Sequence, residues 1–249
     1  MSDTTGREHG PDFDAPTFAE HLYADFPEGL RTNMVMSIDG SVSFRGGRVG
    51  PLSSPADRAL FHALRALSDV VLVGAATARV EKYGPPALSP ELTELRSRTR
   101  GSGTSDIPRL AIVSLSCSLP EKSLDVPPGQ RPIVITSARA DTSAVGDRAE
   151  VIAVGDETID LPAAIDELRA RGLHRINCEG GPSLLDKLTE ADLVDEFCVT
   201  MAPQVTAEGN PVTDPAAAVL SPLDTPPRRF RLKHAVPPHG DDVFLRYVR

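Results

Sequence analysis

The chain has 249 residues, with 26 basic against 35 acidic side chains and a formal net charge of −9 at pH 7. This balance argues against a general nucleic-acid binder, which needs a basic face. Hydrophobic residues make up 40 % of the chain, so it can bury a core, and because Trp is absent that core must be largely aliphatic. No stretch approaches the roughly 20 apolar residues of a membrane span, and no apolar signal segment is present. We therefore expect a cytoplasmic protein that binds neither membrane nor nucleic acid.

The cysteines Cys117, Cys178 and Cys198 are odd in number and lack the C-x-x-C spacing of a zinc site. Each lies in an apolar run, which is typical of a buried thiol. We therefore predict neither a disulfide framework nor a bound metal, and unpaired thiols fit a reducing compartment.

Strand and helix patterns alternate along the chain after a polar start. Residues 1–28 are predicted to form a loosely ordered extension and residues 29–249 a single domain. Apolar patterns predict strands at 32–38, 70–73, 110–113, 132–135, 151–154, 175–178 and 196–201, and helices that begin near residues 54, 77, 161 and 182. A Pro-, Ser- and Gly-rich stretch at 83–108 predicts a long surface excursion, and residues 230–236 and 242–248 an antiparallel hairpin. The alternation predicts an α/β fold with a doubly wound, mainly parallel sheet and an antiparallel C-terminal hairpin.

Two strand ends carry glycine turns, and open α/β sheets bind ligands at the carboxyl ends of their strands. After strand 175–178 comes Glu179-Gly180-Gly181-Pro182-Ser183, where the glycines let the backbone approach a ligand and the next helix offers free N–H groups to a phosphate. Gly74 follows strand 70–73, and Thr77 and Arg79 could hold a second phosphate. Either turn alone could be a plain connection, but the two together favour a dinucleotide.

A third strand end, from Asn33 to Gly40, precedes a helix that carries Asp57 and Arg65. These two residues are eight positions apart and therefore lie roughly on one helix face. A carboxylate can recognise an amino-pyrimidine edge, and an arginine can hold a phosphate or carboxylate tail. Taken alone, a first-turn aspartate and a solvated arginine are the simpler interpretation.

Four motifs in order resemble the riboflavin-biosynthesis pyrimidine reductases, the family of the C-terminal domain of bacterial bifunctional deaminase-reductases. They are N-x-x-x-S-x-D-G from Asn33, S-P-x-D-x-x-x-x-x-x-L-R from Ser54, V-G-x-x-T from Val73 and E-G-G-P-S-L from Glu179. The resemblance covers about residues 30–249, and the chain looks like the actinobacterial branch of the family. The deaminase motifs H-x-E and P-C-x-x-C are missing, which indicates a stand-alone reductase. The resemblance implies a dihydrofolate reductase-like fold, NADPH as the cofactor and a homodimer.

The resemblance also implies which residues hold the ligands. The NADPH contacts would fall on Val35, Gly74, Thr77, Glu81, Ser114, Thr136, Gly180, Gly181, Pro182, Ser183, Leu184 and Leu185, to which the strand-end pattern adds Arg79. The substrate contacts would fall on Val49, Arg65 and Glu179, with Asn33, Ser37 and Asp57 beside them. Arg65 would hold the ribosyl or ribityl phosphate, and Glu179 would face the reacting ring.

Two features complicate the choice of substrate. Glu81-Lys82-Tyr83-Gly84 replaces the family's acidic-acidic-Pro pattern, and no second substrate arginine stands at Leu88. Pro55-Ala56-Asp57, with Phe61 beyond it, also resembles true dihydrofolate reductases, in which a carboxylate at this position binds the pterin.

Our leading interpretation is hydride transfer from NADPH to 5-amino-6-(5-phosphoribosylamino)uracil or a close analogue. Asp57, Glu179 or Asp39 would supply the proton, and a loop over residues 40–50 would close the site. The alternatives are reduction of dihydrofolate or another pterin, and NADPH binding without turnover. An unrelated phosphate-binding protein such as a nucleotidyl transferase would need a metal-carboxylate cluster, for which Asp39 alone is a thin basis.

Overall fold

The computed structural model describes residues 13–42, 49–101, 105–206, 227–237 and 240–249. Within these ranges nine strands form one sheet in the order β5-β4-β3-β2-β6-β1-β7-β9-β8. The strands are β1 Gly29–Ser37, β2 Val70–Gly74, β3 Arg109–Val113, β4 Ile133–Thr136, β5 Glu150–Ala153, β6 Arg175–Cys178, β7 Glu196–Ala202, β8 Arg231–Val236 and β9 Val243–Val248. All neighbours from β5 to β7 pair in parallel, whereas β9 pairs antiparallel with β7 and β8. The predicted mainly parallel sheet with a C-terminal hairpin is confirmed.

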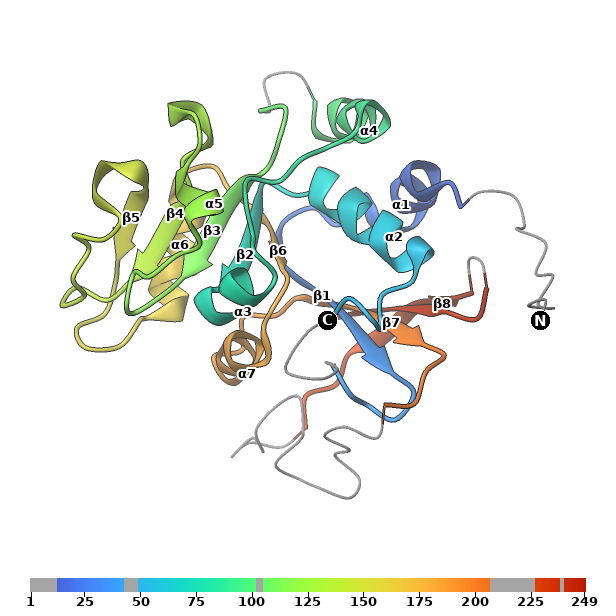
Figure 1. The fold of residues 1–249 in the computed structure, drawn as a ribbon. Coiled ribbons are helices and arrows are strands. Elements are labelled where there is room, and N and C mark those ends of the chain that lie inside the picture. The colour runs from blue at the N-terminus through green and yellow to red at the C-terminus, as the bar shows by residue number, and fades with distance from the viewer. Residues whose placement is uncertain (1–12, 43–48, 102–104, 207–226, 238–239) are drawn as a thin grey trace, which may run out of the picture.

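Helices cover both faces of this sheet (Figure 1). They are α1 Ala15–Tyr23, α2 Pro55–Ala66, α3 Ala75–Val80, α4 Pro90–Arg100, α5 Glu121–Leu124, α6 Leu161–Ala170 and α7 Pro182–Glu190, with two 3-10 turns at Pro128–Gln130 and Gly146–Arg148. Helices α6 and α7 bury Leu168 and Leu188 in a core with β2, β4 and β6. Helices α1, α2 and α4 pack together in a second core, which also contains Phe244 of β9. The doubly wound arrangement is therefore confirmed.

Local signals explain where these elements begin. The Ser54 hydroxyl accepts a hydrogen bond from the Asp57 backbone N–H at 3.0 Å, and Pro55 occupies the first turn of α2. A hydroxyl acceptor and a proline suit a helix N-terminus because the first N–H groups have no partner within the helix. Helix α3 begins at Ala75, two residues before the predicted Thr77.

The stretch 83–108, predicted to be a long surface excursion, contains a helix that the sequence analysis did not predict, α4. Ser89 caps α4 by accepting a hydrogen bond from the Leu92 N–H at 3.4 Å, and Pro90 follows at the first helical position. Leu92 and Leu95 are buried against α1 and α2. A Ser-Pro pair within this Pro-, Ser- and Gly-rich stretch is therefore the start of a helix that is stabilised by tertiary packing.

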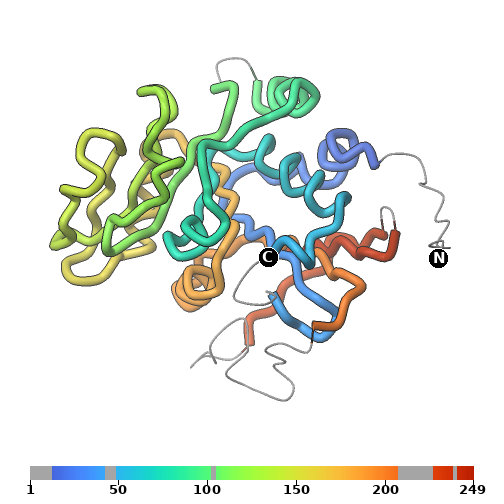
Figure 2. The backbone as a smooth tube through the Cα atoms, viewed as in Figure 1, coloured from blue at the N-terminus to red at the C-terminus, as the bar shows by residue number. Residues whose placement is uncertain are grey.

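The prediction of a loosely ordered start is wrong over residues 13–28, where α1 is part of the core; residues 1–12 lie outside the described residues. Asp14 caps this helix by accepting a hydrogen bond from the Thr17 N–H at 3.1 Å. The ring of Phe18 packs edge-on against Phe244 of β9, with centroids 5.7 Å apart. Figure 2 shows this early segment beside the C-terminal strands. The burial of α1 depends on contacts with residues more than 200 positions away in the chain. The polar residues around α1 in the sequence give no sign of these contacts.

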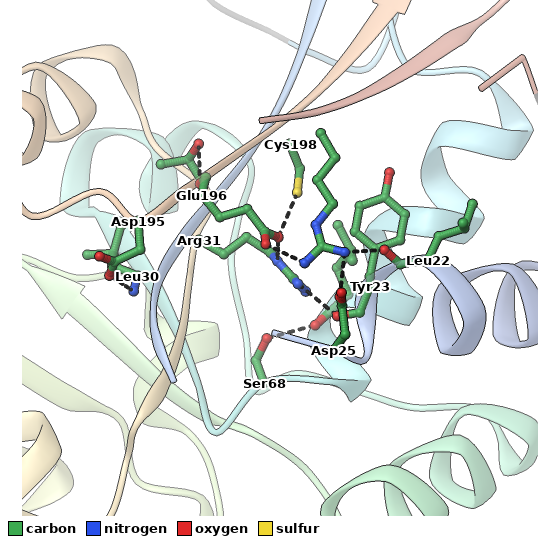
Figure 3. A network of polar contacts seen from close by, with 12 residues as sticks. Leu22, Tyr23, Asp25, Leu30, Arg31, Ser68, Asp195, Glu196 and Cys198 are labelled. Carbon is green, nitrogen blue, oxygen red and sulfur yellow. Dashed lines mark hydrogen bonds and ion pairs between the residues drawn. The ribbon is translucent and has the colours of Figure 1, made fainter. Parts of the chain in front are cut away.

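A buried ion network attaches α1 to the sheet (Figure 3). Glu196 of β7 accepts hydrogen bonds from Arg31 of β1 and, at 2.6 Å, from Arg246 of β9. These three side chains are at most 3 % exposed. Arg31 also donates to the Tyr23 carbonyl at the end of α1 at 2.8 Å, and Arg246 donates to Asp25 just beyond it at 2.6 Å. The charges of β1, β7 and β9 thus satisfy one another and anchor the helix.

The three cysteines are buried, and the helices are short. Cys117, Cys178 and Cys198 are unpaired and buried, as their apolar surroundings predict, and burial raises the pKa of the Cys178 thiol to about 12. In the part of the chain that the structure describes, no helix is long and apolar enough to cross a lipid bilayer.

Candidate active site

A cavity of about 440 Å³ lies between β1, α2 and the segment that follows α3. Its volume is in the range of small-molecule sites. It brings together many of the predicted site residues, namely Asn33, Val35, Val49, Asp57, Arg65, Thr77, Glu81 and Glu179. It is also lined by residues that the motifs did not single out for a role, among them Phe61, His62, Lys82, Tyr83 and Lys122.

Glu179 and Arg65 form a bidentate ion pair in this cavity. The Arg65 Nε and Nη2 groups donate to the two Glu179 oxygens, each at 2.7 Å. Their side chains are 12 % and 1 % exposed. Asn177 donates a further hydrogen bond to Glu179 Oε1 at 3.1 Å. Arg65 and Glu179 thus hold each other in this structure, and the division of labour with Arg65 on a phosphate and Glu179 on the ring stays a prediction.

Aromatic rings reinforce this pair. The Arg65 guanidinium lies 4.2 Å from the centre of the Phe61 ring and 5.3 Å from that of Tyr83. Burial acts to lower the pKa of Arg65, but the charge and hydrogen bonds of Glu179, together with those of Tyr83, outweigh burial and raise it. The guanidinium is thus permanently charged and stacked against aromatic faces, an arrangement that favours arginine over lysine.

Tyr83 is the residue of this cluster that sequence reasoning missed. Its hydroxyl donates to Glu179 Oε2 at 2.7 Å. Burial and the neighbouring carboxylate raise its pKa, so it stays protonated and keeps donating. The sequence signal that could have identified Tyr83 was the altered Glu81-Lys82-Tyr83-Gly84 segment. The role of Tyr83 depends, however, on a contact with Glu179, 96 positions away.

Asp57 is a buried carboxyl group of the cavity with a perturbed acidity. Burial raises its pKa, and the negative charge of Asp242 raises it further, whereas hydrogen bonds from Ser53 and Thr200 act in the opposite direction. Asp57 therefore retains a proton to higher pH than an exposed aspartate does. A perturbed carboxyl group in a cavity is a candidate for proton transfer.

The predicted site residues Ser37 and Asp39 lie outside this cavity, contrary to expectation. The Ser37 hydroxyl accepts from the Ser41 N–H at 2.9 Å and donates to Asp39. The Asp39 carboxylate also accepts from the Thr206 N–H at 3.3 Å. Both side chains thus stabilise the turn that ends β1. Most of the loop predicted to close over the site, residues 43–48, lies outside the described residues.

The glycine turn lies beside the cavity at the ends of β2 and β6. Gly74 donates its N–H to the Gly180 carbonyl at 2.7 Å, so the two strand ends are joined directly. Gly180 has a φ of +79°, which favours glycine, and a Cβ on Gly181 would lie 2.4 Å from the Thr77 hydroxyl. Gly181 precedes α7 without a side-chain cap. The turn therefore excludes side chains and leaves the start of a helix open to a ligand.

The remaining predicted cofactor residues, Arg79, Ser114, Thr136, Pro182, Ser183, Leu184 and Leu185, do not line the cavity. Arg79 donates to the Ser118 carbonyl at 2.8 Å, and Leu184 and Leu185 are buried. Thr136 is buried 3.6 Å from the Cys117 thiol. The buried Ser114 hydroxyl at the end of β3 has no hydrogen-bond partner among the residues that the structure describes.

Comparison with known proteins agrees with this architecture. Residues 29–235 match the family described as the RibD C-terminal domain. The 2,5-diamino-6-ribosylamino-4(3H)-pyrimidinone 5′-phosphate reductase of Archaeoglobus fulgidus is 29 % identical over 174 residues, 69 % of this chain and 78 % of that protein. The protein of the same name from Methanothermobacter thermautotrophicus is 28 % identical over 228 residues, 87 % of this chain and 95 % of that one.

Among solved structures, a pyrimidine reductase-like protein from Corynebacterium diphtheriae superimposes with a TM-score of 0.75 at 28 % identity. The match covers 92 % of this chain and 97 % of that one. With its sheet, its strand-end glycine turns and a family match over most of its length, this chain belongs to the RibD C-terminal domain family.

Proposed function

We propose that this protein is a reductase of riboflavin biosynthesis that uses NADPH to reduce a ribosylaminopyrimidine 5′-phosphate. The observation that carries the proposal is a cavity at the strand ends that is lined by a buried acid, Asp57, and by an Arg65–Glu179 pair. Two relatives are named 2,5-diamino-6-ribosylamino-4(3H)-pyrimidinone 5′-phosphate reductase. That compound and the predicted substrate, 5-amino-6-(5-phosphoribosylamino)uracil, differ at one exocyclic group, and we propose that the chain accepts one of them.

The strand-end turns fit a nicotinamide dinucleotide. The Gly180–Gly181 turn has no room for side chains, the start of α7 is uncapped, and Ser114 offers a hydroxyl without a protein partner in the described residues. Backbone N–H groups at such a helix start suit a diphosphate. We propose that this turn, Gly74 and Thr77 hold NADPH, which supplies the hydride when bound.

Replacing Gly181 by alanine is expected to weaken NADPH binding by about tenfold or more. The new Cβ would meet the Thr77 hydroxyl, and relieving such overpacking costs about 1–3 kcal/mol. Fluorescence titration with NADPH measures the effect. Gly129→Ala is the matched control, because a Cβ there meets nothing within 4 Å. Unchanged NADPH affinity in Gly181→Ala would place the cofactor elsewhere.

The chain's own groups can complete the reduction of a C=N bond. The carbon receives the hydride, the nitrogen receives a proton, and the product is an amine. Glu179 already accepts four hydrogen bonds, two from Arg65 and one each from Tyr83 and Asn177, so its oxygens are occupied. We therefore assign the proton to Asp57 and give Glu179 the role of holding the cavity wall.

Steady-state oxidation of NADPH by the purified protein tests the proposal. The two ribosylaminopyrimidine 5′-phosphates and dihydrofolate are supplied side by side. We expect turnover with one of the pyrimidines. NADPH binding without oxidation of any of the three would instead identify a nucleotide-binding protein without turnover.

Pterin reduction is the second candidate, and Asp57 is the observation that favours it. A buried carboxyl group in a cavity beside Phe61 can pair with the amino-pyrimidine edge of a pterin. Oxidation of NADPH with dihydrofolate, but with neither pyrimidine, would select this candidate.

A cytoplasmic homodimer is also part of the proposal. The three buried, unpaired thiols suit a reducing compartment. Strand β8 lies at the edge of the sheet with exposed residues, so it can extend the sheet into a second copy. Light scattering on the protein as it elutes from a gel-filtration column measures its molar mass and so tests for the dimer.

A further inference from the structure

A ribosyl phosphate needs a positively charged partner, and Arg65 is poorly placed to provide it. Two donor groups of its guanidinium are bound to Glu179, and its face is stacked on Phe61. Moving Arg65 to a phosphate would leave the buried Glu179 without its counter-charge, which is strongly unfavourable. Leu88 stands where the resemblance expects a second arginine, so no charge is available there either.

Lys122 of α5 provides a cation at the cavity from a distant part of the chain. A Cβ on Gly84 would lie 2.9 Å from Lys122 Cε and 3.0 Å from its Cγ, so the lysine stem lies across the Gly84 backbone. The neighbouring Ser123 hydroxyl donates to the Tyr83 carbonyl at 2.8 Å. The contact and the hydrogen bond fasten α5 to the cavity wall, and Lys122 lines the cavity.

Lys82 adds a second ammonium group on the same segment of the wall. In the described part of the chain, no carboxylate forms an ion pair with either Lys82 or Lys122. The nearby Glu81 carboxylate accepts from the Val49 N–H at 3.2 Å. The third cation, Arg58, donates to the Ser53 carbonyl.

The charge of the cavity as a whole favours an anion. Four cationic side chains and three carboxylates line it, although the protein carries a net charge of −9. The Arg65–Glu179 pair cancels internally, which leaves the carboxylates of Asp57 and Glu81 against the three cations Arg58, Lys82 and Lys122. The excess positive charge of the cavity therefore lies on Arg58 and on the two lysines, Lys82 and Lys122.

We infer that Lys122, together with Lys82, binds the 5′-phosphate of the substrate in this chain. The inference rests on the proposed function for the identity of the substrate. The ligand itself is a sugar phosphate monoester, which two ammonium groups can bind as point charges without the planar geometry that an arginine requires. The Arg65–Glu179 pair then forms the wall beside the pyrimidine and does not hold the phosphate.

Calorimetric titration with ribose 5-phosphate tests the inference without turnover. The wild type is expected to bind ribose 5-phosphate more tightly than ribose. Lys122→Ala should weaken that binding about tenfold, and the double variant Lys82→Ala/Lys122→Ala about a hundredfold, as the loss of charged contacts predicts. Lys122→Arg should restore most of the affinity, and Lys187→Ala, which removes an exposed lysine of α7, should leave it unchanged.

The titrations are repeated with saturating NADP⁺ to separate the substrate phosphate from the phosphates of the cofactor. Persistence of the Lys122 effect supports the inference. Equal wild-type affinity for ribose 5-phosphate and ribose overturns it, and so does a lysine effect confined to the affinity for NADP⁺. If ribose 5-phosphate binds as expected but neither pyrimidine is reduced, the proposed function fails while the phosphate site stands.

Discussion

Replacing Glu196 by alanine is expected to lower the free energy of unfolding by about 3–5 kcal/mol, the usual effect of breaking a buried ion pair. Glu196 is the counter-charge of both Arg31 and Arg246, and its side chain is 1 % exposed. Without it, two guanidinium groups remain buried between β1 and β9 with a single carboxylate, that of Asp25, on Arg246. The contacts of Arg31 and Arg246 with the end of α1 are expected to weaken with the same change.

Chemical denaturation followed by circular dichroism measures this loss. Glu196→Gln keeps an acceptor for one arginine and is expected to lose less stability than Glu196→Ala. Arg98→Ala is the control on an ion pair of α1, because Arg98 pairs with Glu20 and Glu94 at the surface, where salt and solvent screen the charges. A Glu196→Ala protein as stable as the Arg98→Ala protein would show that the network contributes little.

Replacing Asp57 by asparagine is expected to lower kcat by about 10²–10⁴-fold, the usual contribution of a positioned proton donor. Asparagine keeps the size and one oxygen of the side chain but cannot release a proton at neutral pH. The Ser54 cap on the Asp57 backbone N–H remains, so α2 should fold as before. Steady-state kinetics with the accepted substrate measures the loss, while the affinity for NADPH is expected to stay the same.

The pH dependence of kcat tests this assignment, because a proton donor predicts the direction in which kcat changes with pH. Burial and the charge of Asp242 raise the pKa of Asp57, and only the protonated acid can deliver a proton. The wild-type rate should therefore fall as the pH rises through that raised pKa, and Asp57→Asn should lose this limb.

Asp242→Asn is the matched control, because it removes the neighbouring negative charge and keeps an acceptor for Ser54. In that variant Asp57 should ionise at lower pH, so the limb should shift toward acid while activity persists. A wild-type limb that survives in Asp57→Asn would assign the proton to another group.

Much of the fold follows from local signals in the sequence. The strand at 175–178 and the helix that starts at Pro55 coincide with their predicted positions. Their determinants, an apolar run before a glycine and a Ser-Pro cap, act over a few residues. The alternation of strands and helices determined a parallel sheet, and the strand-end glycines marked the edge at which we propose that ligands bind.

Only the tertiary structure decided which side chains meet at that edge. Glu179 pairs with Arg65 across 114 positions of sequence, a contact that no local pattern in the sequence predicts. Tyr83 and Lys122 meet in one wall of the cavity, where the Ser123 hydroxyl binds the Tyr83 carbonyl. Asp39 is the opposite case. The motif made its carboxylate a candidate acid, but the carboxylate accepts a hydrogen bond from the Thr206 N–H outside the cavity.

Helix α1 is a second feature that local sequence patterns do not predict. Its polar surroundings predict a loosely ordered extension, yet Phe18 packs on Phe244 and Arg31 binds the carbonyl of Tyr23. The sequence by itself therefore determined the strands, the helices α2, α3, α6 and α7 and their order, because caps and apolar periods are local. The tertiary structure decided the partners of each charge, because burial and counter-charge depend on residues that lie far apart in the chain.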